Sequence, residues 1–182
     1  PYTPRDYNPT GAYRTTFTVP SDWKGEEVFL RFEKVASASF LWVNGQEVGY
    51  NEGAQETAEY NITPYLKKGR NTLAMMVVKY SDGYYLEGQD YWRLAGIFDD
   101  VYLYATPKTR LFDWYVTTDL DKEYKDADLR IEATVRSYDD VPVQSPLKVL
   151  AVLSDAEGKT VAELESEEAR FAAGSKSMTL TM

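Results

Sequence analysis

The chain has 182 residues and a formal net charge of −9, and it contains neither cysteine nor histidine. The lack of these two residue types excludes disulfides, thiolate and imidazole metal sites, cysteine nucleophiles and Ser-His-Asp triads. The acidic balance and the absence of a basic stripe argue against nucleic acid as a partner. No apolar run approaches the roughly 18–20 residues that a membrane-spanning helix needs, so no membrane partner is expected.

The first seven residues have neither a basic start nor an apolar core, and no initiator methionine is present. The segment is therefore not expected to be a signal peptide, and the chain is expected to have been processed or excised from a longer one.

The first hundred residues show the period of two that is typical of strands. The turn Asn44-Gly45 predicts a tight hairpin, because both central residues of a type I′ turn need positive φ. Thr63 is a candidate cap for one short helical turn, with Pro64 at its first position. Strands are predicted over 12–19, 28–33, 40–43, 46–50, 71–78 and 101–104.

A linker is predicted at 106–109, because the composition changes there. Of the 26 aromatic residues, 20 precede Pro107 and six follow it. A turn at 155–158 and five short strands predict an immunoglobulin-like sandwich, which normally needs about seven strands and about 100 residues. We therefore expect two domains, 1–106 and 107–182, the second incomplete at its C-terminus. The strands of the second domain are predicted over 111–118, 129–137, 147–154, 160–167 and 178–182.

The segment 80–100 fits neither a strand nor a helix, and it combines aromatic residues with Asp82, Glu87, Gln89, Asp90 and Arg93. A long loop of this composition suits a saccharide, because aromatic rings stack on sugar C–H faces and carboxylates accept hydroxyl protons. The alternative is that the aromatic residues fill a core and the acids are solvated. Nothing in the sequence pairs two carboxylates for glycosidic catalysis. Trp42 is predicted to lie in a core, and Trp114 to pack between two sheets.

Several motifs, in order, resemble glycoside hydrolase family 2, most closely its large bacterial β-galactosidases. The resemblance covers about residues 8–119, and beyond it the chain resembles the family's following immunoglobulin-like domain. The motifs are Asn8-Pro9-Thr10-Gly11-Ala12-Tyr13-Arg14, Phe40-Leu41-Trp42-Val43-Asn44-Gly45 with Val48-Gly49-Tyr50, Tyr80-Ser81-Asp82-Gly83, Leu86-Glu87, Gln89-Asp90, Trp92-Arg93 and Gly96-Ile97-Phe98.

The resemblance implies an all-β chain: a sugar-binding jelly-roll β-sandwich over 1–106, with its N-terminal strands missing, followed by a truncated immunoglobulin-like β-sandwich over 107–182. It implies a retaining glycosidase whose two catalytic Glu residues and magnesium ligands lie in a later TIM barrel, so this chain alone is expected to be inactive. It also implies a β-galactoside substrate, a homo-oligomeric parent, and a cytoplasmic or periplasmic location in bacteria.

One site residue carries over from the family motif. The Asp before Trp-Arg matches Asp90, which the resemblance implies as a ligand of galactosyl hydroxyls and of a sodium ion shared with a missing domain. Gln89, Trp92 and Arg93 are expected to support the loop around Asp90. No cofactor is expected to be held by this chain alone. The alternatives are a self-contained carbohydrate-binding module, a structural or oligomer-forming domain, and a fragment of a β-glucuronidase or β-mannosidase.

Overall fold

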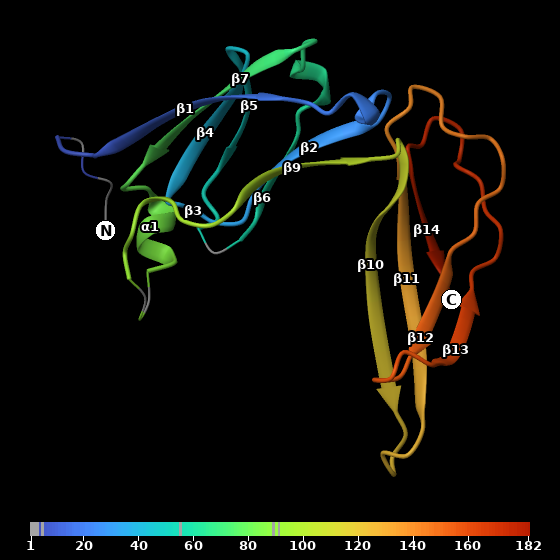
Figure 1. Cartoon of the computed structure of the whole chain (residues 1–182). Helices are drawn as coiled ribbons and strands as arrows, with labels where there is room; N and C mark the ends of the chain where they lie inside the picture. Colours follow the sequence, from blue (N-terminus) through green and yellow to red (C-terminus); the bar gives the residue numbers. More distant parts are fainter. Residues whose placement is uncertain (1–3, 5, 55, 89, 91) are drawn as a thin grey trace. The chain divides into compact units, whose positions relative to one another are not determined.

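The computed structural model describes residue 4 and residues 6–54, 56–88, 90 and 92–182. The chain forms two compact units, Pro1–Thr106 and Pro107–Met182, and each is described by itself. Both are built almost entirely from β-strands (Figure 1). The predicted all-β class is confirmed, and the sheets form sandwich-like layers.

One layer of the first unit is a four-stranded antiparallel sheet in the order β1-β7-β4-β5. The predicted hairpin joins β4 and β5, with φ of 53° at Asn44 and 81° at Gly45. The side-chain amide of Asn44 donates to the side chain of Asn71 at 2.8 Å, which anchors this turn. The strands are β1 (Thr10–Thr18), β7 (Arg70–Val78), β4 (Ala38–Val43) and β5 (Gln46–Asn51).

The other layer is a three-stranded sheet in the order β6-β2-β9. Its strands are β6 (Ala58–Asn61), β2 (Glu27–Phe32) and β9 (Val101–Thr106). A further short ladder pairs β3 (Val35–Ala36) with β8 (Gly96–Ile97). The remaining elements are the 3-10 turns η1 (Ser21–Trp23) and η2 (Thr63–Tyr65) and one helix, α1 (Asp82–Leu86).

A hydrophobic core lies between the two sheets. Every second residue of β4 and β7 faces it, since successive side chains of a strand point to opposite faces. Phe32, Leu41 and Val43 are almost wholly excluded from water. The other buried members are Val28, Leu30, Val35, Ala58, Ile62, Met75 and Val77.

Two predictions about single residues of this unit are wrong. Trp42 is only half-buried, because it alternates with Leu41 and Val43 and so lies on the outer face of its sheet, where it stacks with Phe40. The cap of η2 is Ile62, and Thr63 instead accepts the backbone N–H of Val28 at 2.8 Å. The strand register places Trp42, whereas the hydroxyl of Thr63 is used to hold η2 against β2.

The second unit contains five strands close to the predicted positions. β10, β11 and β14 form one sheet, and β12 pairs with β13 through the predicted turn, where the N–H of Gly158 donates to the carbonyl of Asp155 at 3.0 Å. The strands are β10 (Thr109–Leu120), β11 (Ala127–Ser137), β12 (Leu150–Ser154), β13 (Thr160–Glu165) and β14 (Ser177–Thr181).

The core of the second unit is thin. Trp114 pairs with Ala133 and Val116 with Ile131, so they share a face of the sheet with buried Ala133. Trp114 nevertheless stays 64% exposed and Val116 48% exposed. The predicted inter-sheet packing of Trp114 is therefore not present. Among the described residues, no helix is long and apolar enough to span a membrane.

Candidate functional site

The predicted loop after β7 contains a short helix, α1, that the sequence analysis did not predict. Its first turn is capped by Ser81, whose Oγ accepts the N–H of Tyr84 at 3.2 Å. Ser81 Oγ also lies 2.7 Å from Ser37 Oγ, and Ser37 donates to the carbonyl of Val78 at 3.2 Å. Both serines are buried, so the start of the helix is fixed to β7. Serine at an N-cap is a signal that the sequence offered.

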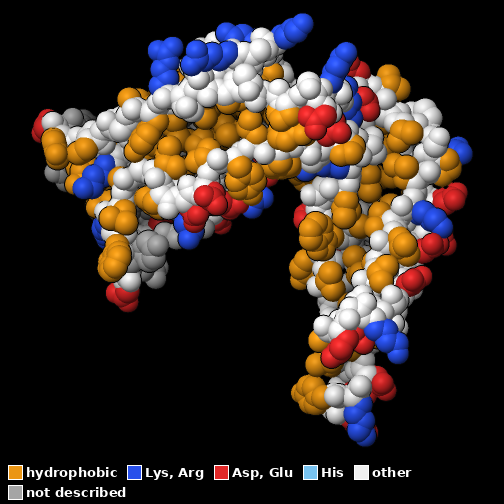
Figure 2. All heavy atoms as spheres, viewed as in Figure 1, with side chains coloured by type: hydrophobic (Ala, Val, Ile, Leu, Met, Phe, Trp, Pro, Cys, Tyr) orange, Lys and Arg blue, Asp and Glu red, His pale blue; other side chains and the backbone are white. Residues whose placement is uncertain are grey.

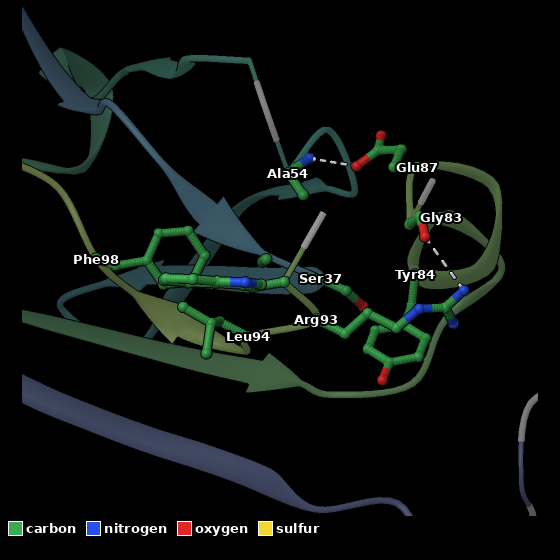
Figure 3. A pocket seen from close by; sticks show the side chains of 11 residues that line it. Ser37, Ala54, Gly83, Tyr84, Glu87, Arg93, Leu94 and Phe98 are labelled. Carbon is green, nitrogen blue, oxygen red and sulfur yellow. Dashed lines mark hydrogen bonds between the residues drawn. The ribbon is translucent and has the colours of Figure 1, made fainter. Parts of the chain in front are cut away.

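The C-terminal end of α1 is tied to the segment that follows β5. The carboxylate of Glu87 accepts the backbone N–H of Ala54 at 2.9 Å (Figure 3). Gly83 permits a close approach, since a Cβ there would lie 3.2 Å from the carbonyl oxygen of Glu52. The helix is thus held at both ends, and Glu87 is used for structure.

Arg93 closes the turn that carries Asp90. Its guanidinium carbon lies 5.1 Å from the ring centre of Tyr84 and 5.9 Å from that of Tyr85. Its side chain also donates to the carbonyl of Gly88 at 3.3 Å (Figure 3). A planar guanidinium can stack on rings and donate at the same time. Arg93 is therefore held against Gly88 and against the rings of α1.

The Asn-Pro-Thr-Gly motif fixes the other side of the loop. The side-chain amide of Asn8 donates to the carbonyl of Tyr80 at 2.8 Å and accepts the N–H of Tyr80 at 2.9 Å. The N–H of Lys79 donates to the carbonyl of Pro9 at 3.0 Å. The side chain of Asn8 thus imitates a strand backbone and extends the ladder between β1 and β7. This role could not be read from the sequence, because the partner lies 72 residues away.

Asp90 lies on this anchored turn with its side chain exposed. Trp92 is 83% exposed, so its rings are open to a partner rather than packed beneath the loop. Gln89 lies outside the described residues. The structure thus brings Asp90, Trp92 and Arg93 onto one turn, with Arg93 holding it and the other two open to solvent.

The hollow beside this turn is small. Ser37, Ala54, Tyr84, Glu87 and Phe98 line it, and its cavity volume is about 30 Å³. That volume holds about one water molecule, whereas small-molecule sites usually span about 300–1,000 Å³. A sugar ring bound at Asp90 would therefore need walls from outside this unit.

Comparison with known proteins places the chain in a family. Residues 1–107 match the model of the glycosyl hydrolases family 2 sugar binding domain. The chain belongs to glycosyl hydrolase family 2, and the recognised resemblance is confirmed.

Curated relatives that the chain resembles are β-galactosidases. It is 43% identical over 161 residues to the β-galactosidase of Priestia megaterium, covering 88% of this chain and 16% of the relative. It is 43% identical over 166 residues to that of Vibrio cholerae, covering 91% of this chain and 16% of the relative. The chain thus spans about a sixth of the length of these relatives.

A solved structure that the chain resembles is a β-glucuronidase. Bacteroides uniformis β-glucuronidase 2, covalently bound to cyclophellitol-6-carboxylate aziridine, superposes with a TM-score of 0.83 at 26% identity, covering 97% of this chain and 21% of that chain. The fold of both units is therefore also found in a β-glucuronidase.

Proposed function

We propose that this chain is a non-catalytic part of a β-galactosidase that hydrolyses terminal β-galactosides, with the catalytic barrel elsewhere in a longer family-2 polypeptide. The observation that carries the proposal is the 43% identity to β-galactosidases across 88% of the chain, which includes both units. Fold alone would not support a substrate. The structure adds an anchored turn that presents a carboxylate to solvent.

Asp90 is the residue that we propose for the galactosyl subsite. A carboxylate accepts hydrogen bonds from two sugar hydroxyls, and the exposed Trp92 offers an apolar face beside it. The anchors at Ser81, Glu87 and Arg93 restrict the turn, so less conformational entropy is lost when a sugar binds. The catalytic barrel would supply the remaining walls of the site.

A sodium ion at Asp90 fits the chemistry of a hard cation, which prefers oxygen ligands. Among the described residues, no group of three or more acidic side chains gathers to hold a metal. Asp90 would therefore supply one oxygen ligand, and the others would come from the barrel. The magnesium ion of the longer polypeptide is likewise proposed to bind outside this chain.

A self-contained carbohydrate-binding module is disfavoured by the 30 Å³ hollow beside the turn, which cannot enclose a sugar ring. A β-glucuronidase parent is favoured only by the structural likeness at 26% identity, well below the 43% identity to β-galactosidases.

The test is hydrolysis of chromogenic β-galactoside and β-glucuronide by this chain and by the longer polypeptide, with and without Asp90→Ala. We expect the chain alone to be inactive and the longer polypeptide to cleave the galactoside. We expect Asp90→Ala to lower its kcat/KM by about a hundredfold or more, since a charged hydrogen bond is worth about 1.5–3 kcal/mol and two are lost. Asp100→Ala is the matched control, because Asp100 is also exposed and lies ten residues further on.

Three outcomes would contradict the proposal. Cleavage by the chain alone would require a catalytic carboxylate pair within these 182 residues. Equal activity of Asp90→Ala and Asp100→Ala would remove Asp90 from the subsite. Preferential cleavage of the glucuronide would replace the galactosidase assignment.

A further inference from the structure

A column of side chains joins the end of β7 to the turn that carries Asp90. The rings of Tyr80 and Tyr84 meet edge to face, with their centres 5.0 Å apart. The guanidinium carbon of Arg93 lies 5.1 Å from the centre of the Tyr84 ring (Figure 3). Edge-to-face ring pairs and cations placed over rings are both attractive arrangements. Tyr84 therefore connects Tyr80, which closely follows β7 in the chain, with the Arg93 end of the turn.

The β7 end of the column is fixed by hydrogen bonds. The side chain of Asn8 bonds both the N–H and the carbonyl of Tyr80. The N–H of Tyr84 donates to the Oγ of buried Ser81 at 3.2 Å. The Tyr84 ring also meets the ring of Tyr85, with 5.2 Å between the centres, and Figure 2 shows hydrophobic side chains, a class that includes tyrosine, around α1. The Tyr84 ring is therefore held from the side of β7, independently of the turn that follows.

The Arg93 end of the column needs a glycine. A Cβ added at Gly88 would lie 2.9 Å from the guanidinium carbon of Arg93 and 2.9 Å from the carbonyl oxygen of Tyr84. Carbon atoms in contact are normally about 3.5–4.0 Å apart, so a side chain there would push the guanidinium away from the ring. Gly88 is not one of the glycines with a positive φ. Packing, rather than the backbone conformation, therefore requires the absence of a side chain at this position.

The column is not needed to form α1. The helix already has Ser81 at its N-cap, and the carboxylate of Glu87 accepts the N–H of Ala54 at 2.9 Å. Arg93 lies beyond the helix, on the far side of Asp90 in the chain. What the column adds is a restraint on the exposed turn that ends at Arg93.

We propose that Tyr84 is a positioning residue of the galactosyl subsite, which acts through Arg93 on the carboxylate of Asp90. The inference rests on the proposed function, because it concerns the same subsite. A carboxylate stays aligned with sugar hydroxyls only where its turn is restrained, and a displacement of about 1 Å can cost about a hundredfold in rate. The turn is exposed, so the restraint that this chain supplies comes from Arg93 and the ring on which it stacks. Gly88 makes room for the guanidinium.

A double-mutant cycle in the longer polypeptide separates positioning from stability. The kcat/KM for a chromogenic β-galactoside is measured for Tyr84→Ala alone and combined with Asp90→Ala. We expect Tyr84→Ala to lower kcat/KM about tenfold when Asp90 is present, and less than about twofold when it is absent. A residue that acts through Asp90 loses its effect once that carboxylate is removed, whereas a loss of folded protein would act equally in both backgrounds.

Two further variants define which part of the column matters. Tyr84→Phe keeps the ring and should stay within about twofold of the wild type. Gly88→Ala also keeps the ring but displaces the guanidinium. It should therefore reproduce both the loss of kcat/KM and its dependence on Asp90.

Two matched controls repeat these changes away from the column. Tyr124→Ala removes a ring of the second unit that is 80% exposed. Gly53→Ala adds a Cβ that would lie 3.5 Å from the Cβ of Glu56, which is an ordinary contact distance. Both variants should keep the wild-type kcat/KM.

Hydrogen exchange on the 182-residue chain tests the restraint without hydrolysis. The N–H of Leu94, which directly follows Arg93, donates to the carbonyl of Trp92 at 3.0 Å. We expect this amide to exchange at least about threefold faster in Tyr84→Ala, because a contact that restrains the turn adds to its local stability. In Tyr84→Phe it should exchange at the wild-type rate.

Three results would overturn the positioning role. These are the same loss of kcat/KM with and without Asp90, an equal loss in Tyr84→Phe, and unchanged exchange at Leu94 in Tyr84→Ala. A longer polypeptide that does not cleave the galactoside would count against the proposed function alone, because the exchange at Leu94 still decides whether Tyr84 restrains the turn.

Discussion

The two units have equally regular strands but differ in what those strands enclose. In the first unit, alternate side chains of two facing sheets meet, and Leu41 and Val43 are wholly buried. In the second unit, the buried hydrophobic side chains among the described residues are Ala133, Val135 and Leu180, while Trp114 stays exposed. Strand pairing satisfies the backbone in both units, but only a second layer removes side chains from water. The stability of the two units should therefore respond differently to equivalent substitutions.

The largest expected difference is in the cores. Leu41→Ala should lower the free energy of unfolding of the first unit by about 2–5 kcal/mol, through lost burial and the cavity left behind. Leu150→Ala changes the same residue type in the second unit, where Leu150 is 54% exposed, and should cost less than about 0.5 kcal/mol. Urea denaturation followed by circular dichroism checks both. Similar losses would show that the second unit buries Leu150 in solution.

Buried polar contacts give the next difference. Asn71 is fully buried. Its side-chain oxygen accepts hydrogen bonds from Asn44 and Lys67, and its side-chain nitrogen donates to the carbonyls of Lys67 and Gly69. Asn71→Ala should lower the free energy of unfolding of the first unit by about 3 kcal/mol, because several buried groups lose their partners together.

The counterpart in the second unit is Ser166, which is buried and accepts the N–H of Val149 at 3.0 Å. Ser166→Ala should lower the free energy of unfolding by about 1 kcal/mol, since it removes the acceptor for Val149 and one hydrogen bond to the carbonyl of Glu167 at 3.0 Å. The same urea titrations measure both variants. A Ser166 variant as damaging as the Asn71 variant would contradict the ranking.

A smaller and more local effect is expected at the site. Arg93→Ala removes the stacking on Tyr84 and the hydrogen bond to Gly88, worth about 1 kcal/mol at an exposed position. The amide of Glu87, which donates to Gly83 at 2.9 Å, should then exchange about fivefold faster, with the global midpoint unchanged. Arg93→Lys keeps the charge but not the planar group. If Lys restores slow exchange, charge rather than stacking holds the turn.

The smallest effect depends on pH. Hydrogen bonds from Tyr102, Arg31 and Thr57 lower the pKa of Glu33 below its ordinary value of 4.5. The ionised carboxylate therefore stabilises the first unit fully above pH 4.5, and this contribution is lost as the pH falls through the lowered pKa. The difference in melting temperature between wild type and Glu33→Gln should be largest at neutral pH. It should shrink towards zero as the pH falls through the lowered pKa of Glu33.

The matched control for this pH dependence is Glu132→Gln in the second unit. Glu132 forms an exposed ion pair with Arg130 at 2.8 Å, and such pairs contribute little. The melting temperature of the Glu132→Gln variant should therefore follow that of the wild type at every pH. A gap for Glu33→Gln that widens in acid would reverse the assigned direction of the pKa shift.

Local signals in the sequence predicted most of the strands. β11, β13 and the turn at Asp155 fall within a few residues of their predicted positions, because alternation and turn residues act over short distances. Helix α1 was missed, although Ser81 is a good N-cap. Its five residues are too few for a helical period to be visible.

For the site, the motif pattern alone selected Asp90, Trp92 and Arg93, and their assignment to a sugar subsite stays a prediction. The contacts that hold their turn could not be predicted, since Ser37, Ala54 and Asn8 reach it from distant parts of the chain. Side-chain hydrogen bonds of this kind depend on which strands become neighbours.

Composition and period by themselves determined that this protein is all-β, that its composition changes near Pro107, and that it has no thiol or imidazole chemistry. These properties follow from residue types and local spacing. The tertiary structure decided which aromatic residues are buried, how the Asp90 turn is anchored, and which edges remain open. Burial depends on whether another layer covers a given face of a sheet. Within the described part of this chain, no layer covers Trp114, and β1 pairs with a neighbouring strand on one edge alone.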